Sequence, residues 1–384
     1  MIDLDAQATT PPVPEVLAAM RPYLEEVHWN PHSAHRGGRR ARAALEAARA
    51  EVAALLDAEP AEIVFTSGAT EANNLALKGL LAERSGPRQR LVTFATEHAC
   101  VLETARHLAR LGVPVSILPV TREGLPDMDA YQAALAEGDV ALVSAMAVNN
   151  EVGAIWPIPA LARLAHAAGA LFHTDAAQAA GKIDCRLSPG GGLAGADLVS
   201  LSAHKMHGPK GIGALRVPQG LRLAPLLDGG GQEAGLRSGT QAPALAAGFG
   251  AAARLAREEL PARLAHARCL MTIALSLLAP VPHRVNGPDP LGPARWPGNL
   301  SVRFPGLDSA RIIARLPEVA LASGAACASG SGKPSHVLAA LGLRAEEARA
   351  TLRLGWHARS TEAEVRDGIG RLVETVRRLA PMAA

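Results

Sequence analysis

Residues 63–83 read IVFTSGATEANNLALKGLLAE. The first three are β-branched or aromatic, which predicts a short buried strand over residues 63–65. From about Glu71 to Glu83 apolar residues recur at spacings of three and four, which predicts a helix. Small and hydroxyl-bearing residues fill the turn at 66–70. A strand, a tight turn and a helix in this order form the repeating unit of an α/β protein.

The same unit recurs along the chain. The runs at 91–93, 115–118, 140–145, 171–173 and 198–200 predict further strands, and the segments 98–111 and 159–168 predict helices between them. We interpret this alternation as a largely parallel sheet covered by crossover helices.

The pattern changes after Gly231. A long helical stretch from 242 to about 278 leads into a Pro/Gly-rich passage at 280–298, and strands near 300–304 and 351–354 alternate with helices at 309–316 and 361–379. The predicted fold class is therefore α/β, with a large domain of mostly parallel sheet and a smaller α+β C-terminal domain. We place the large domain at residues 14–255 and the small one at 1–13 and 256–384, with the change inside the long helix.

Composition excludes several classes of function. The net charge of +3 is spread along the chain, and 4 Trp, 2 Tyr and 5 Phe are too few for a base-stacking platform, so we expect no direct nucleic-acid partner. The longest stretch without charged residues, 238–253, is shorter than the roughly 20 residues that cross a bilayer, so no membrane span is predicted. The chain begins with Asp3 and Asp5 in place of a basic, then apolar, segment, and we expect a cytoplasmic location.

Polar residues follow several of the predicted strands, at the edge where α/β proteins bind ligands. The turn at 66–70 predicts either an anion site or a plain capped helix start. Asp175 ends one strand, with Gln178 one helical turn beyond. Ser202, His204 and Lys205 follow the next. An anion-binding turn, an acid that can pair with a pyridinium nitrogen and a lysine that can form a Schiff base are together the parts of a pyridoxal phosphate site.

The four cysteines lie far apart, without a CxxC pair or a Cys/His cluster, so neither a zinc site nor a disulfide framework is predicted. Cys100, Cys185 and Cys269 are interpreted as small buried hydrophobes. Cys327 lies in the run ASGAACASGSGK at 322–333, which has almost no bulky side chains to anchor it in a core. We expect a mobile, exposed loop at about 322–334, which suits a nucleophile that must travel.

The whole series of motifs resembles the NifS/IscS-like cysteine desulfurases of the class V aminotransferase group, which have the pyridoxal phosphate fold type I. The matching stretches are ATTP at 8–11, NPHSAH at 30–35, FTSGATE at 65–71, TEH at 96–98, VNNEVG at 148–153, GGGQE at 229–233, RSGT at 237–240 and SGAAC at 323–327, with the segments around Asp175 and Lys205.

The resemblance implies roles for individual residues around pyridoxal 5'-phosphate. Lys205 would hold the cofactor as a Schiff base, His98 would stack on its ring, Asp175 would pair with the ring nitrogen and Gln178 would hydrogen-bond the phenolic oxygen. Asn150 would support the substrate side. The residues implied at the phosphate are Ala69, Thr70, Ser202 and His204, joined by Thr240 from the neighbouring subunit of a homodimer with a shared active site.

The resemblance further implies that Arg353 grips the substrate carboxylate, for which a guanidinium fork is suited. L-Cysteine would be the substrate, the catalytic residues would be Lys205, His98 and Cys327, and no metal would take part. The products would be L-alanine and a persulfide on Cys327, whose sulfur passes to an acceptor protein such as an iron-sulfur scaffold or a sulfur carrier, for cluster assembly or for thiolation of cofactors and tRNA. The sequence ends soon after Leu379, and we expect the protein to lack the extended C-terminal tail that housekeeping iron-sulfur-assembly members carry.

Other activities share this scaffold, because a fold does not determine a reaction. A selenocysteine lyase or a class V aminotransferase is the main alternative. A kynureninase-like hydrolase or a non-catalytic cofactor-binding regulator is another, although the regulator would not need Lys205, Asp175, His98, Arg353 and Cys327 together.

Overall fold

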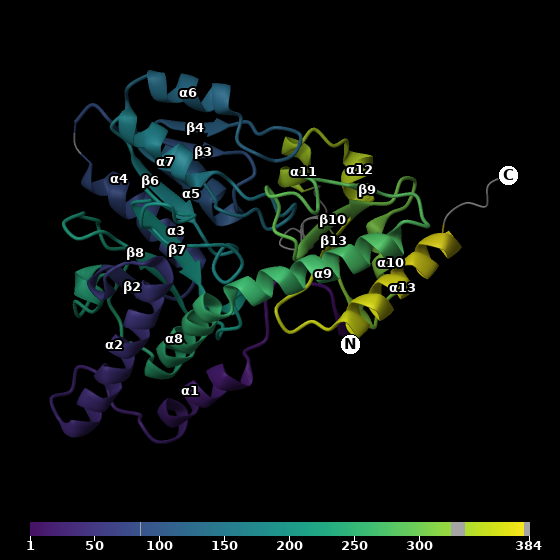
Figure 1. Ribbon diagram of the computed structural model, residues 1–384. Helices are drawn as coiled ribbons and strands as arrows, with labels where there is room; N and C mark the ends of the chain where they lie inside the picture. Colours follow the sequence, from purple (N-terminus) through teal and green to yellow (C-terminus); the bar gives the residue numbers. More distant parts are fainter. Residues whose placement is uncertain (85, 324–334, 380–384) are drawn as a thin grey trace.

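The computed structural model describes residues 1–84, 86–323 and 335–379 (Figure 1). Its largest sheet has the strand order β2-β8-β7-β6-β5-β3-β4. Only β8 runs against its neighbours in this sheet, and the other adjacent pairs are parallel. The strands are β2 (Ile63–Thr66), β3 (Arg90–Phe94), β4 (Val115–Leu118), β5 (Val140–Ser144), β6 (Leu171–Asp175), β7 (Leu198–Ser202) and β8 (Gly213–Arg216).

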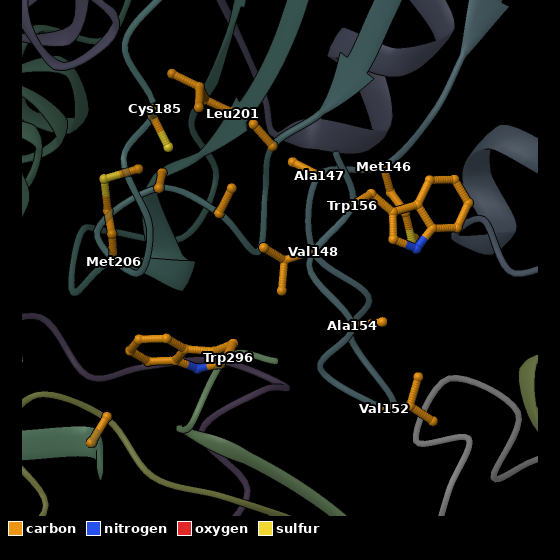
Figure 2. Packing of buried hydrophobic residues seen from close by; sticks show 14 of the residues in the cluster. Met146, Ala147, Val148, Val152, Ala154, Trp156, Cys185, Leu201, Met206 and Trp296 are labelled. Atoms are coloured by element: carbon orange, nitrogen blue, oxygen red, sulfur yellow. The ribbon is translucent and has the colours of Figure 1, made fainter. Parts of the chain in front are cut away.

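Both faces of this sheet are buried. Successive side chains on a strand point to opposite faces, and here they enter two different apolar clusters. Val64 and Leu142 belong to one apolar cluster, and their neighbours Phe65 and Val143 belong to another. The second cluster continues toward the C-terminal part of the chain. Figure 2 shows part of it, with Val148 of the large sheet's loops and Trp296 of the 280–298 passage. Helices therefore cover both faces, as a parallel sheet requires.

The N-terminal helices α1 and α2 pack against α8, and α9 packs against α13. Figure 1 shows α9 leading from the large sheet toward the C-terminal elements. The helices are α1 (Pro14–Glu25), α2 (Arg36–Leu56), α3 (Ala69–Asn74), α4 (Leu80–Glu83), α5 (Ala99–Arg110), α6 (Met128–Ala136), α7 (Ile158–Ala167), α8 (Pro243–Glu258), α9 (Leu260–Leu278), α10 (Ser309–Ile313), α11 (His336–Ala340), α12 (Ala345–Arg349) and α13 (Glu362–Leu379).

A smaller antiparallel sheet has the order β12-β13-β10-β9. Its strands are β9 (Arg284–Val285), β10 (Asn299–Arg303), β12 (Ala322–Ser323) and β13 (Thr351–Gly355). Strand β1 (Ile2–Asp3) pairs with β11 (Val319–Ala320), so the first residues of the chain lie beside its C-terminal part. The N-terminal segment then passes on toward the large sheet, and this path brings residues 5–11 to the region between the two sheets.

The predicted α/β fold class is confirmed, while individual elements differ, two of them inside or beside the large domain. The helix predicted over 242–278 is wrong as one element, since α8 ends at Glu258 and α9 begins at Leu260. Pro261, at the start of α9, lacks the N–H that a continuous helix needs. Strand β8 was not predicted, because its Gly-Ala-Leu-Arg sequence carries little β-branched character. The division into domains at 14–255 and at 1–13 with 256–384 stays a prediction.

Candidate active site

A cavity of about 570 Å³ opens at the carboxyl ends of the central strands. Parallel strands end at the same edge of a sheet, so the loops that follow β2, β3, β5, β6 and β7 converge there. The predicted residues that line this cavity are Ala69, Thr70, His98, Asn150, Asp175, Gln178, Ser202, His204, Lys205 and Arg353. The structure thus brings together ten side chains that span most of the sequence.

Lys205 ends the short 3₁₀ turn η3 (Ala203–Lys205), directly after β7. Its Nζ donates to the carbonyl oxygens of Gln7 and Ala8, each at 2.8 Å. The N-terminal segment is fastened to this loop, because Thr10 N donates to His204 O at 2.9 Å. These contacts hold the lysine amine at the cavity by main-chain acceptors that carry no charge.

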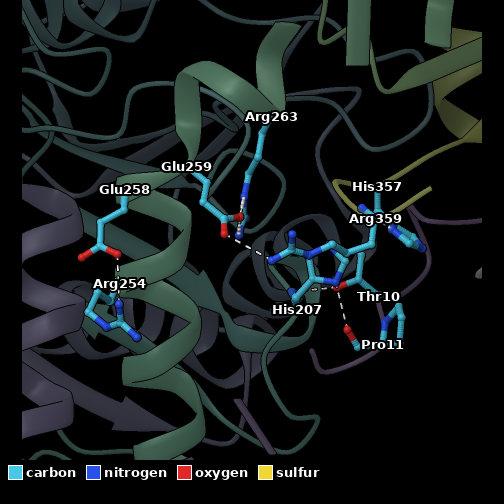
Figure 3. A network of polar contacts seen from close by, with 9 residues as sticks. All are labelled: Thr10, Pro11, His207, Arg254, Glu258, Glu259, Arg263, His357 and Arg359. Carbon is cyan, nitrogen blue, oxygen red and sulfur yellow. Dashed lines mark hydrogen bonds and ion pairs between the residues drawn. The ribbon is translucent and has the colours of Figure 1, made fainter. Parts of the chain in front are cut away.

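The N-terminal segment also contacts His207, two residues after Lys205 (Figure 3). Its N–H donates to Thr10 Oγ1 at 2.8 Å, and its Nδ1 lies 2.9 Å from Pro11 O. His207 has a φ of +71°, an uncommon conformation for a side-chain-bearing residue. The loop after Lys205 is therefore held in an unusual backbone shape by the N-terminal segment.

Asp175 is the last residue of β6, and its side chain is buried. Oδ1 accepts the Ala177 N–H at 2.9 Å, and Oδ2 accepts Asn73 Nδ2 at 2.7 Å. Both contacts fix the orientation of the carboxylate at the wall of the cavity. Asn73, on α3, was missed by the sequence analysis, although it lies one turn beyond Thr70 in a stretch that the analysis had singled out.

Ala69 and Thr70 are the first residues of α3, so their N–H groups have no intrahelical carbonyl partner. The helical segment continues through a π turn, η2 (Leu75–Gly79), into α4. Ser202 and His204 reach the same end of the cavity from β7 and η3. Burial, with Lys205 nearby, lowers the pKa of His204 to about 4, so its ring is neutral near pH 7. Hydroxyls, a neutral imidazole and N–H groups without an intrahelical partner make this end suited to an anion.

Thr240 lies apart from the other predicted residues. It is exposed and lines a separate hollow of about 160 Å³, which shares Ser67 and Gly211 with the main cavity. The neighbouring Arg237 pairs with Glu71 at 2.9 Å, and Glu71 accepts the Ser67 N–H at 2.8 Å. The 237–240 segment therefore lies next to the 66–70 turn, and the contribution of Thr240 from a second subunit stays a prediction.

Arg353 lies on the central strand β13 of the small sheet and is 3% exposed. Nη2 pairs with Asp5 Oδ1 at 2.8 Å, and Nη1 donates to Asn150 O at 3.4 Å. Nε is buried and has no hydrogen-bond partner in the described part of the chain. A buried guanidinium with an unused donor at the wall of a cavity is suited to a carboxylate ligand.

His98 caps the N-terminus of α5 and also lines the cavity. Its Nδ1 accepts the Cys100 N–H at 3.2 Å and lies 3.1 Å from Cys100 Sγ. Because Nδ1 is the acceptor, the neutral ring carries its proton on Nε2. His98 can therefore cap helix α5 and still carry a proton on Nε2.

Two buried glutamates near the site were quoted within motifs but given no role. Burial and the nearby Asp175 carboxylate raise the pKa of Glu97 well above its ordinary value, and its Oε1 accepts the Met146 N–H at 2.6 Å. Burial raises the pKa of Glu151 to about 7, and its Oε2 accepts Ser335 Oγ at 2.5 Å. Sequence alone cannot show that these two acids are enclosed.

Glu151 makes stability depend on pH in a defined window. Its carboxyl binds its proton more tightly in the folded chain than in the unfolded one, so its contribution to stability falls as pH rises from about 4.5 to about 7. Glu151→Gln removes this loss. The free energy of unfolding of the variant minus that of wild type is therefore expected to be about 3 kcal/mol larger at pH 8 than at pH 4.5. Urea unfolding at the two pH values measures it, and an equal difference at both would contradict the prediction.

Cys327 lies outside the described residues, as does the rest of 324–334. The described chain stops at Ser323 on β12, whose neighbour Ala322 pairs with Arg353 in the small sheet. It resumes at Ser335, the residue bonded to Glu151. Of the other cysteines, Cys185 is buried as predicted. Cys269 is exposed, and Cys100 lines the cavity, so the interpretation as buried hydrophobes is wrong for both.

The model of the family described as aminotransferase class-V matches residues 2–367. The chain belongs to the class-V aminotransferase family. Among its relatives is the mitochondrial cysteine desulfurase of Saccharomyces cerevisiae, 43% identical over 99% of this chain and 76% of that protein. The mitosomal cysteine desulfurase of Encephalitozoon cuniculi is 42% identical over 100% of this chain and 88% of that protein.

Among solved structures, a NifS-like protein has a TM-score of 0.90 at 34% identity, covering 98% of this chain and 100% of that one. The class-V fold therefore extends over nearly the whole chain, including the small sheet that carries Arg353. None of the helices in the described residues is long and apolar enough to cross a membrane.

Proposed function

We propose that the chain is a cysteine desulfurase that uses pyridoxal 5'-phosphate to take sulfur from L-cysteine. The observation that carries this function is the meeting of Lys205, Asp175 and Arg353 at one cavity in a chain 40–43% identical to cysteine desulfurases. An amine, a carboxylate and a buried guanidinium are the groups that bind an aldehyde, a pyridinium nitrogen and an amino-acid carboxylate.

The residues at the cavity fit pyridoxal phosphate. Lys205 would hold it as a Schiff base, Asp175 would pair with the ring nitrogen, and His98 would lie against the ring. Ala69, Thr70, Ser202 and His204 would hold the phosphate, and Gln178 would donate to the phenolic oxygen. When bound, the cofactor supplies an electron sink for the bonds at the amino acid's Cα.

The protein's own groups position the amino acid and move its protons. Arg353 would take the substrate carboxylate with its Nε donor, which has no partner among the described residues, while Asn150 supports the substrate side. Lys205, once released from the cofactor, would take the proton from Cα, because its amine lies at the cavity. His98, whose Nδ1 is occupied by the backbone, would carry a proton at Nε2.

The thiolate of Cys327 would attack the substrate sulfur. The Cβ–S bond breaks as the S–S bond forms, so the sulfur leaves as a persulfide on Cys327, and the electron pair on carbon takes a proton to give L-alanine. A thiol reductant or an acceptor protein then removes the outer sulfur. No oxidant is needed, because the sulfur gains an S–S bond as the carbon gains a C–H bond.

Further parts of this function concern the assembly. The protein would work as a homodimer in which Thr240 completes the partner's phosphate site. In support, Thr240 is exposed and does not line the main cavity of its own chain. The sulfur acceptor would be an iron-sulfur scaffold or a sulfur carrier. The enzyme itself would be located in the cytoplasm.

Product analysis separates this function from its alternatives. Supplied with L-cysteine and a thiol reductant, the wild-type enzyme is expected to release alanine and sulfide in equal amounts. A transaminase would instead need a keto acid and would yield no sulfide, and a lyase restricted to selenocysteine would leave L-cysteine unchanged. Either of those results would overturn the proposal.

A further inference from the structure

Lys182 is a buried lysine that the mechanism above does not use. It lies four residues after Gln178, in the turn that follows β6, and is 7% exposed. Its Nζ hydrogen-bonds Gln178 Oε1 and lies 3.4 Å from Gln7 Oε1. Lys182 also lines a small hollow of about 20 Å³ together with Lys205. It therefore lies directly behind the wall of the active-site cavity.

The surroundings of Lys182 favour its neutral form. Burial lowers its pKa well below the ordinary value, and the charged groups that act on it, Lys205 and Arg353, are cations that lower it further. Among the described residues no carboxylate forms an ion pair with it. A neutral amine has two N–H donors, and the two amide oxygens of Gln178 and Gln7 can accept both.

Gln178 is fixed at both ends of its carboxamide. Its Nε2 donates to the Gln7 carbonyl at 2.9 Å, and its Oε1 accepts from Lys182. The Gln7 side chain is fixed in turn, because its Nε2 donates to Gly298 O at 2.6 Å. With the oxygen turned toward Lys182, one N–H of Gln178 is left for an acceptor in the cavity that Gln178 lines.

We propose that Lys182 is a positioning residue, which holds the amide of Gln178 so that an N–H faces the cofactor's phenolic oxygen. This hydrogen bond makes the oxygen a weaker acceptor for the proton on the nitrogen that links Lys205 to the cofactor. This inference rests on the proposed cofactor and on the role of Gln178 given above. A donor at the phenolic oxygen draws negative charge away from it, so the oxygen attracts the neighbouring proton less.

The test is a pH titration of the visible absorbance of the loaded enzyme without substrate. Lys182→Met keeps the apolar stem and removes the donors, and its absorbance midpoint is expected about one pH unit above that of wild type. Gln178→Leu should raise the midpoint similarly. In the double variant the second change should add nothing, because both act through one hydrogen bond.

Two further variants make the test specific. Lys182→Gln keeps an N–H donor and is expected to keep the midpoint near that of wild type. Lys78→Met changes a lysine that does not line the cavity and should leave the midpoint unchanged. If Lys182→Met does not load with cofactor, Lys182→Gln decides: a midpoint raised as far as in Gln178→Leu would overturn the proposal.

An unshifted midpoint in loaded Lys182→Met, or shifts that add in the double variant, would also overturn it. This failure is distinct from failure of the proposed function. Wild-type protein that binds no cofactor, or that yields no alanine from L-cysteine, would refute the function. Normal alanine release together with an unshifted midpoint would refute only the role of Lys182.

Discussion

Lys205→Ala is expected to lower alanine release from L-cysteine at least about a thousandfold. The variant loses two things at once, the amine that links the cofactor and the base that takes the Cα proton. Lys205 Nζ lies at the cavity on two main-chain carbonyls, a position that the short alanine side chain does not reach. Initial rates of alanine formation at saturating cofactor measure the effect.

Lys78→Ala is the matched control, since Lys78 lies on the helical segment that begins at the site but does not line the cavity. It should retain the wild-type rate. The absorbance of Lys205→Ala should also lack the band of a linked cofactor, and borohydride should no longer fix the cofactor to the chain. Alanine release near the wild-type rate in Lys205→Ala would contradict the assigned role.

Cys327→Ala is expected to abolish the release of both alanine and sulfide while leaving the cofactor's spectrum intact. The thiolate is the only acceptor that the mechanism offers for the substrate sulfur, and the substitution leaves Lys205 and Asp175 untouched. Assays of both products in the presence of a thiol reductant measure the effect.

Cys269→Ala provides the comparison, because Cys269 is exposed on α9 and does not line the cavity. It should behave as wild type. Sulfide release by Cys327→Ala at the wild-type rate would mean that the sulfur leaves without a persulfide at this position.

The large sheet could be predicted because its strands are short apolar runs between amphipathic helices, and local sequence carries that signal. The break at Glu259 could not, since Pro261 is as compatible with the first turn of a new helix as with a kink. Strand β8 is defined by its antiparallel pairing with β2 and β7, which is a long-range contact and leaves little local trace.

The residues of the candidate site likewise include some that local sequence predicts and others that depend on distant contacts. Residues that follow strands, such as Asp175 and Lys205, could be placed at one edge because parallel strands end there. Asn73 and Lys182 could not be assigned from sequence, since their importance lies in what they contact, namely Asp175 and Gln178. The burial that gives Glu151 its raised pKa also depends on packing from distant segments.

The mass of the peptide that contains Cys327 tests the transfer of sulfur to this residue most directly. The loaded enzyme is incubated with L-cysteine in the absence of a reductant, and its thiols are then alkylated. We predict that this peptide becomes heavier by one sulfur atom, and that it does not in Lys205→Ala. Alanine formation with the extra sulfur on another cysteine such as Cys100, or on none, would contradict the account.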